Sequence, residues 1–340
     1  MASISSLIGQ QNGFKGKLSN SFNYEDVYIL KKVTFWEPSG LFGYQSWIQI
    51  MSDDDPNDPI SGSSNTIAWE NGKKVKPIVY VSNSNARLET EFEISCSGGN
   101  ASKYYARATN EDGYNFPVRE LTLSNGRNRY PKTDCDKKFD DKVVRYWENF
   151  ELKWEISNKA NGPWIDCGSC KNYLYVTHKL PLIGLTPAGH SEPTYAQLTF
   201  IHIGCKNANG KSSSTDIVDN IYTEFTDQDV RRFDQKGPIQ YWGTNVGSPE
   251  CWQPSKMLIN LDGRCGGWAA FFDVIIRLQG IAVCEISAVD YNSGVLPPNS
   301  IMKQESDIKF YFGAEAVNVQ TLDGNLKIGG KPERSHFYVK

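Results

Sequence analysis

The chain has 340 residues, of which 39% are hydrophobic and 22% charged, and its formal net charge is −3 at pH 7. This length suffices for about two or three domains with a substantial apolar core. The near-neutral charge argues against nucleic acid or an anionic membrane as a partner, and no apolar stretch reaches membrane-spanning length.

Residues 1–22 are polar and rich in Gly, Ser and Asn, so we expect a flexible lead-in. This start has no basic n-region and no long apolar h-region, so it is not recognised as a signal peptide. We therefore expect a cytoplasmic protein, or one exported by a route that needs no signal peptide.

Residues 23–185 are predicted to be β-rich, because short β-branched and aromatic runs alternate there with turn-forming segments. The clearest turn is residues 52–59, which holds four Asp, one Asn and two Pro. Strands at this spacing favour an immunoglobulin-like β-sandwich. The predicted strands are residues 27–30, 33–36, 78–81, 92–94, 104–107 and 121–123.

A second β unit after a break near residue 140 is an open alternative to one continuous sandwich. Residues 150–156 alternate apolar and polar side chains, and residues 173–177 are another aromatic and β-branched run. The many aromatic residues of this half have two interpretations. They pack in the core and across strands, or they form an exposed platform that binds glycan or peptide.

Eight cysteines are present, an even number that is compatible with disulfides. Because no signal peptide is recognised, the reduced state is favoured. Cys167 and Cys170 form a lone Cys-x-x-Cys pair, whereas zinc needs about four ligands and the nearest candidate, His178, lies on an expected strand. We predict no metal site, and interpret the pair as turn residues, with a redox pair or local disulfide as the alternative.

The sequence pattern changes after residues 181–193, which hold three Pro and two Gly and are predicted to be a linker. Residues 215–225 carry a helical apolar stripe, which Thr215 or Asp216 can cap. Helices followed by strands indicate α+β order. The strands expected in this half are residues 282–286, 308–312 and 336–339.

Cys265 stands where a glycine-rich turn runs into an apolar helix predicted at residues 268–278. Asp262 can serve as the N-cap of this helix, and Gly280 suits the position just after its end. The unpaired amides of a first helical turn, together with the helix dipole, lower the pKa of a cysteine placed there. A buried structural cysteine is the alternative.

The run Gly-Arg-Cys-Gly-Gly-Trp-Ala at residues 263–269 is followed by Phe271-Phe272 and by an Arg-Leu-Gln-Gly-Ile-Ala ending within residues 275–282. Together these residues resemble the nucleophile segment of the transglutaminase-like superfamily of cysteine acyltransferases and peptidases. The resemblance extends weakly upstream through residues 241–243 and covers roughly residues 190–340.

The resemblance implies a transglutaminase-like, papain-type α+β domain at residues 190–340, behind the N-terminal β-sandwich region. It further implies a cysteine-dependent peptidase, deamidase or transglutaminase that acts on a protein or peptide through a thioester intermediate and uses no cofactor. The alternative is a catalytically incomplete module that uses its β-sandwich region to bind protein or glycan.

The resemblance also implies a catalytic histidine on a strand after the cysteine, and His336 is the candidate by this order. A surface histidine is the alternative interpretation of His336. His178 lies in the β-rich region and His190 in the predicted linker. His202 stands in an apolar stretch, where a histidine with satisfied hydrogen bonds in the core is expected.

Related enzymes place an Asp or Asn on the strand after the histidine, but only four residues follow His336 here. We expect either that the sequence is a piece of a longer protein or that the active site is incomplete. Asp290, Asp307 and Asp323 are substitute candidates, and their spacing selects none of them.

An oxyanion hole would use the backbone amide of Cys265 and one further donor. The candidates for that donor are Trp242, Trp252 and Gln253, with packing as the alternative role of either tryptophan. Glycines at 266 and 267 leave room for a substrate backbone beside the sulfur.

Overall fold

The computed structural model is a mixed α+β structure made mostly of strands, with four α-helices among the residues it describes. The predicted lead-in at residues 1–22 and most of the predicted linker lie outside the described residues. The described residues are 27–37, 48–55, 57–62, 66–73, 75–95, 103–182, 194–226, 229–241, 253–263, 265–282, 286–290, 310–311, 327–328, 331–332 and 335–339.

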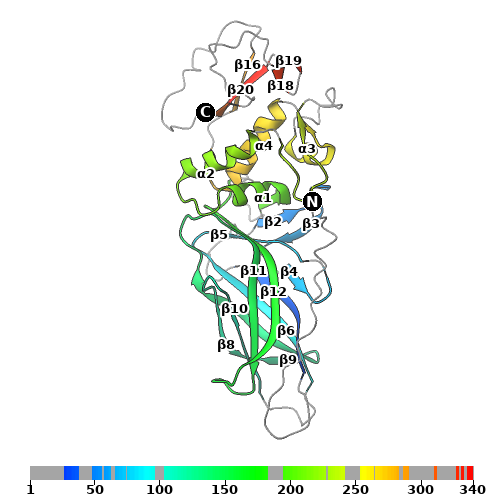
Figure 1. Ribbon diagram of the computed structural model, residues 1–340, viewed down its shortest axis with the longest axis vertical. Helices are drawn as coiled ribbons and strands as arrows, with labels where there is room; N and C mark the ends of the chain where they lie inside the picture. The colour runs from blue at the N-terminus through cyan, green and yellow to red at the C-terminus, as the bar shows by residue number, and fades with distance from the viewer. Residues whose placement is uncertain are drawn as a thin grey trace, which may run out of the picture.

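Two five-stranded sheets form the β-rich part of the described chain (Figure 1). The first has the order β4 (Thr66–Glu70), β1 (Val27–Trp36), β6 (Asn85–Ser95), β10 (Arg127–Lys138) and β9 (Thr122–Ser124). The second has the order β5 (Ile78–Val81), β12 (Ile165–Thr177), β11 (Arg145–Ser157), β7 (Tyr105–Thr109) and β8 (Phe116–Glu120). Adjacent strands are antiparallel in both sheets, except that β5 runs parallel to β12.

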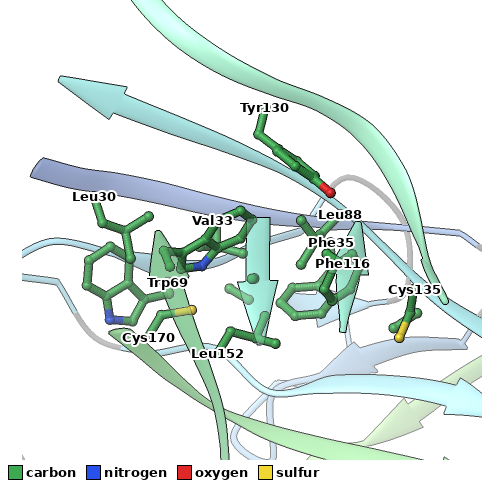
Figure 2. Packing of buried hydrophobic residues seen from close by; sticks show 14 of the residues in the cluster. Leu30, Val33, Phe35, Trp69, Leu88, Phe116, Tyr130, Cys135, Leu152 and Cys170 are labelled. Atoms are coloured by element: carbon green, nitrogen blue, oxygen red, sulfur yellow. The ribbon is translucent and has the colours of Figure 1, made fainter. Parts of the chain in front are cut away.

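A first hydrophobic core fills the space between these two sheets (Figure 2). Alternate residues of each strand point into it, as the period of a strand requires. Trp154 on β11 is fully buried, and the rings of Phe92 and Tyr130 meet it edge-on at centroid distances of 5.4 and 5.2 Å. Truncation of a side chain this large in a packed core typically costs about 3–5 kcal/mol of stability.

The helices form a layer at one end of the long sheets (Figure 1). They follow a short third sheet in which β13 (Thr194–Gln197) runs parallel to β2 (Ile48–Met51), and β2 pairs with β3 (Pro59–Gly62). The helices are α1 (Leu198–Asn207), α2 (Ser214–Tyr222), α3 (Pro254–Asn260) and α4 (Cys265–Leu278), with a 3₁₀ turn η2 (Thr223–Phe225) after α2.

A second hydrophobic core joins the helical layer to the sheets. It contains apolar residues of α1 and α4, such as Ile201 and Ile275, together with Val79 of β5 and Tyr175 of β12. Since other residues of β12 belong to the first core, this strand contributes to both cores. The helical layer is therefore built directly on the second sheet.

Helices α1 and α4 approach each other closely at Gly204 of α1. A Cβ atom at this position would come within 2.7 Å of the Gln279 side chain and 3.1 Å of Ile275. Gln279 follows α4, is fully buried, and accepts a hydrogen bond from the His178 amide at 3.1 Å. This side chain therefore links the end of α4 to the chain just after β12.

Short strands lie at the far end of the helical layer (Figure 1). β20 (Ser335–Val339) pairs antiparallel with β16 (Ile286–Asp290) on one side and with β17 (Phe310–Tyr311) on the other. β18 (Lys327–Ile328) pairs with β19 (Lys331–Pro332), and β14 (Gln240–Tyr241) runs parallel to β15 (Asp262–Gly263). Among the described residues no helix is long and apolar enough to cross a bilayer.

Three local predictions are wrong. Cys167 and Cys170 are not turn residues: β12 continues through them, with a bulge in which Gly168 has φ of 106° and donates to Asp166 at 2.7 Å. The sequence around this bulge resembles a turn because a bulge uses the same Gly and Asp chemistry.

The other two corrections concern helix starts. Ser213, and not Thr215 or Asp216, is the N-cap of α2, and its hydroxyl accepts a hydrogen bond from the Asp216 amide at 3.1 Å. Asp262 does not occupy the N-cap position of α4, because it belongs to β15 and the helix begins three residues later. Gly280 is placed as predicted, with φ of 69°.

Candidate active site

α4 begins at Cys265, the first residue of the helix. At its other end the Ile281 amide donates to the Ile276 carbonyl at 3.4 Å, and the Gly280 amide donates to the Arg277 carbonyl at 2.9 Å. This is the Schellman arrangement, in which a left-handed glycine satisfies carbonyls that the helix leaves unpaired. The helix that carries Cys265 is thus firmly terminated at the end remote from the cysteine.

The chain reaches Cys265 through α3 and β15. α3 ends at Asn260 and is capped by Leu261, whose φ of 53° is left-handed, and the Leu261 carbonyl accepts a hydrogen bond from the Gln240 amide at 2.8 Å. Gly263 then packs against Met257 so closely that an added Cβ would lie 2.8 Å from the Met257 sulfur. Gly263 therefore packs against the flexible end of the Met257 side chain on α3.

Aromatic residues surround the first half of α4. Trp268, Phe271 and Phe272 are buried, and Phe225 of η2 meets all three at steep interplanar angles and centroid distances of 6.1, 5.9 and 5.3 Å. Edge-to-face ring contacts of this kind stabilise by about 0.5–1.5 kcal/mol each beyond the area they bury. They hold η2 against the helix that begins at Cys265.

His336 lies on β20, the middle strand of its three-stranded sheet. Cα atoms of α4 approach those of β20 and of β16 to within 8 Å, so the helix that begins at Cys265 lies beside the strand that carries His336. The side chains of Cys265 and His336 lie outside the described part of the structure, and Gly266 follows Cys265 in the first turn of α4.

The register of this sheet bears on the residue that would orient His336. Val289 of β16 stands opposite His336, and Asp290 stands opposite Ser335. Because successive residues of a strand belong to opposite faces, Asp290 and His336 occupy positions on opposite faces of the sheet. The other two substitute candidates, Asp307 and Asp323, lie outside the described residues.

Two other histidines are described, and both are engaged in packing. His202 is on α1, where its Nδ1 is 3.1 Å from the Tyr175 hydroxyl and burial lowers its pKa to about 4. His178 is buried, its Nδ1 is 2.6 Å from the Lys142 carbonyl, and burial lowers its pKa. The expectation of a satisfied core histidine at 202 agrees with this geometry. His190 lies outside the described residues.

Four of the other cysteines are free and buried, namely Cys135, Cys167, Cys170 and Cys205. Burial raises the pKa of Cys135, Cys170 and Cys205 to about 12 each, and it raises the pKa of Cys167 well above the usual range. These thiols therefore carry almost no thiolate at neutral pH, and thiolate is the reactive form.

The remaining predicted site residues have mixed outcomes. Gln253 is exposed and stands at the N-cap position of α3, where its carbonyl accepts a hydrogen bond from the Met257 amide at 3.0 Å. Gly267 is buried within the first turn of α4. Trp242 and Trp252 lie outside the described residues, so their proposed contribution to an oxyanion hole stays a prediction.

Residues 229–240, which no sequence motif marks, form hydrogen bonds to the chain that leads into Cys265. Arg232 in this segment is 2% exposed and bonds to the Leu258 carbonyl near the end of α3 at 2.8 Å. No local sequence signal marks this arginine as buried, because two of its partners, Leu258 and Asp54, come from distant parts of the chain. Within the described residues, no group of three or more His, Cys, Asp and Glu side chains could hold a metal ion.

Comparison of the chain with models of known protein families, with curated proteins and with solved structures gives no match. Any function must therefore be argued from the residues and geometry of the site itself.

Proposed function

We propose that the protein is a cysteine-dependent amide-bond enzyme, a peptidase, deamidase or transglutaminase, that acts on a protein or peptide substrate. In this mechanism the thiolate of Cys265 attacks the amide carbonyl carbon, the C–N bond breaks, and the leaving amine takes a proton from His336. The resulting thioester passes its acyl group to water or to an amine, while His336 removes a proton from that acceptor.

One observation carries the proposal: α4 begins at Cys265, and the same helix lies beside β20, the strand of His336. The amides of a first helical turn have no partner within the helix and point outward along its axis. They favour negative charge, and therefore a thiolate, at that end. Since the base must lie within hydrogen-bond reach of the sulfur, a histidine strand packed on this helix suits the chemistry.

The finer description of the fold belongs to the same proposal. Residues 190–340 would form a transglutaminase-like, papain-type domain, and residues 23–185 would form an immunoglobulin-like β-sandwich region. Supporting the first assignment is an antiparallel sheet, β16, β20 and β17, beside the helix of Cys265. The second is supported by the two five-stranded sheets that enclose the first core.

The test is selective alkylation of the native protein with iodoacetamide at pH 7, followed by mass spectrometric mapping of each cysteine. We expect Cys265 to react at least about tenfold faster than any of the other seven cysteines, because the first turn of α4 favours a thiolate, whereas burial raises the pKa of the four described thiols. The four buried thiols provide internal controls. Equal labelling of all cysteines, or labelling of Cys265 more slowly than a free thiol, would contradict the proposal.

A catalytically incomplete module that binds protein or glycan through its β-sandwich region is the second candidate. The register of β16 and β20 favours it, because Val289 and not a carboxylate stands opposite His336. Loss of the residue that orients a catalytic histidine lowers the rate by several powers of ten. If the Cys265→Ala variant retains every measurable activity and binding property of the wild type, this second candidate is the correct one.

A further inference from the structure

Among the described residues near the approach to Cys265, Arg232 is the most deeply buried charged side chain, with 2% exposure. Its Nε and Nη2 donate to the two carboxylate oxygens of Asp234 at 3.1 and 2.7 Å, and Nη2 also lies 2.9 Å from Asp54. The fourth contact is from Nη1 to the Leu258 carbonyl at 2.8 Å. The planar guanidinium therefore uses all three of its nitrogens at once, which few other side chains can do.

The contact with Leu258 is the one that bears on the site. This carbonyl belongs to the last turn of α3, where carbonyls have no partner within the helix. From Leu258 the chain needs only seven residues to reach Cys265. The neighbouring hydrogen bond from Gln240 to the Leu261 carbonyl comes from the same segment as Arg232. Residues 229–241 thus hold this short approach at two successive points.

The segment itself is anchored to the rest of the fold. The Phe233 amide donates to the Thr199 hydroxyl at 2.9 Å, and that hydroxyl donates to the buried carboxylate of Asp53 at 2.7 Å. Lys236 donates to Asp54 at 2.6 Å. Because Asp53 and Asp54 lie in the turn between β2 and β3, the Arg232 network connects the third sheet, α1 and the end of α3.

We propose that Arg232 is a positioning residue for Cys265, since it fixes the end of α3 and thereby the direction in which the chain enters α4. This inference rests on the proposed function, because it assigns Arg232 a role in holding the first-turn amides of α4 at the cysteine. Arg232 does not touch the reacting atoms and acts only through α3 and β15.

The test compares two conservative variants, Arg232→Lys and Arg231→Lys. A lysine at 232 keeps the positive charge but cannot bind both oxygens of Asp234 and the Leu258 carbonyl together. The control at the adjacent position changes an exposed arginine, paired with Asp229 at 2.8 Å, in the same segment. The rate of iodoacetamide alkylation of Cys265 is measured from pH 5 to 9 at a temperature where both variants are folded.

We expect Arg232→Lys to raise the thiol pKa by about one unit, which slows alkylation at pH 6 by about fivefold, and Arg231→Lys to leave the profile unchanged. A merely structural role would lower the melting temperature without moving this pH profile. If Arg232→Lys does not fold, Asp234→Asn takes its place, with an expected slowing of about threefold at pH 6 because one of two charge-assisted bonds is weakened.

The two proposals fail in different ways. If wild-type Cys265 reacts with the pH profile of a free thiol, the proposed function is overturned and the role of Arg232 with it. If the wild-type profile is shifted to low pH and a folded Arg232→Lys variant has the same profile, only the positioning role is overturned. An equal shift in Arg231→Lys would also overturn it, since the effect would not depend on the buried network.

Discussion

At the scale of single residues, His202 shows how packing decides whether a histidine is available for chemistry. Its ring contacts those of Phe233 and Tyr146 edge-on, at centroid distances of 4.9 and 5.4 Å. Burial lowers its pKa to about 4, so it is neutral at pH 7. A neutral ring cannot form the imidazolium that stabilises a thiolate, and His202 is therefore a poor partner for a catalytic cysteine.

This lowered pKa makes stability depend on pH. The unfolded chain takes up a proton at His202 near pH 6.5, whereas the folded chain does so only near pH 4, so acidification through this window favours unfolding. We expect the wild type to lose about 2 kcal/mol more than His202→Gln between pH 7 and pH 5. The measurement is urea unfolding of both proteins at the two pH values, and parallel losses would contradict the neutral state of His202.

Some residue roles could not be read from the sequence because their partners are remote in it. The turn at residues 52–59 is predicted by its Asp, Asn and Pro content, but its second role is not. Asp53 accepts a hydrogen bond from the Thr199 amide at 3.0 Å and so caps α1 from a distant turn. The burial of Arg232 could not be predicted either, because its contacts with Leu258 and Asp54 join distant parts of the chain. Cys265 could be chosen as a candidate from the sequence because the glycines, the cysteine and the apolar helical run follow one another directly along the chain.

At the scale of elements, the end of α4 is held against the chain that leaves β12. The Lys179 amide donates to the Gln279 carbonyl at 3.1 Å, and the Leu182 amide donates to the Arg277 carbonyl at 2.9 Å. A Cβ atom at Gly280 would lie 2.5 Å from the Leu180 carbonyl oxygen. Two separate features therefore favour glycine at position 280, namely the left-handed backbone and the close approach of the Leu180 carbonyl.

Gly210 is a matched control for this pair of requirements. It has φ of 82°, close to the 69° of Gly280, but an added Cβ would meet nothing within 4 Å. We expect Gly210→Ala to cost about 1 kcal/mol for the left-handed backbone alone, and Gly280→Ala to cost about 2–4 kcal/mol because crowding is added. Equal losses in denaturant unfolding would show that the contact between α4 and residues 179–182 is loose.

The strands were easier to predict from the sequence than the helices. Residues 150–156 alternate strongly and residues 173–177 are an aromatic and β-branched run, and both lie within long observed strands, β11 and β12. α1 was not predicted as a helix, because seven of its ten residues are buried and no polar face reveals the helical period. Gly168 shows the opposite error, since a bulge within β12 has the residue chemistry of a turn.

At the scale of the whole molecule, the two hydrophobic cores share β12. One set of its residues packs between the long sheets and another, including Tyr175, packs under the helical layer. The helix of Cys265 therefore rests, through α1, on a sheet that a second large core stabilises. A site built on such a base keeps its geometry better than a site on free loops. The α+β class was predicted from the change in sequence period, whereas the sharing of β12 was not.

The candidate site could be predicted only in part, because the sequence does not reveal how strands pair. The sequence order places a cysteine helix before a histidine strand, and the structure brings that helix and strand side by side. A third residue that orients His336 cannot be chosen from the sequence, because such a residue is set by sheet register. The register places Asp290 and His336 at positions on opposite faces of this sheet.

The pH profile of Cys265 alkylation in the wild type and in His336→Gln tests the central claim most directly. If His336 is the catalytic base, the wild type reacts as a thiolate paired with an imidazolium, with a plateau that begins below pH 7. The variant should then react about tenfold more slowly at pH 6 and approach the profile of a thiol with a pKa near 8.5. Identical profiles in a folded variant would contradict the pairing of Cys265 with His336.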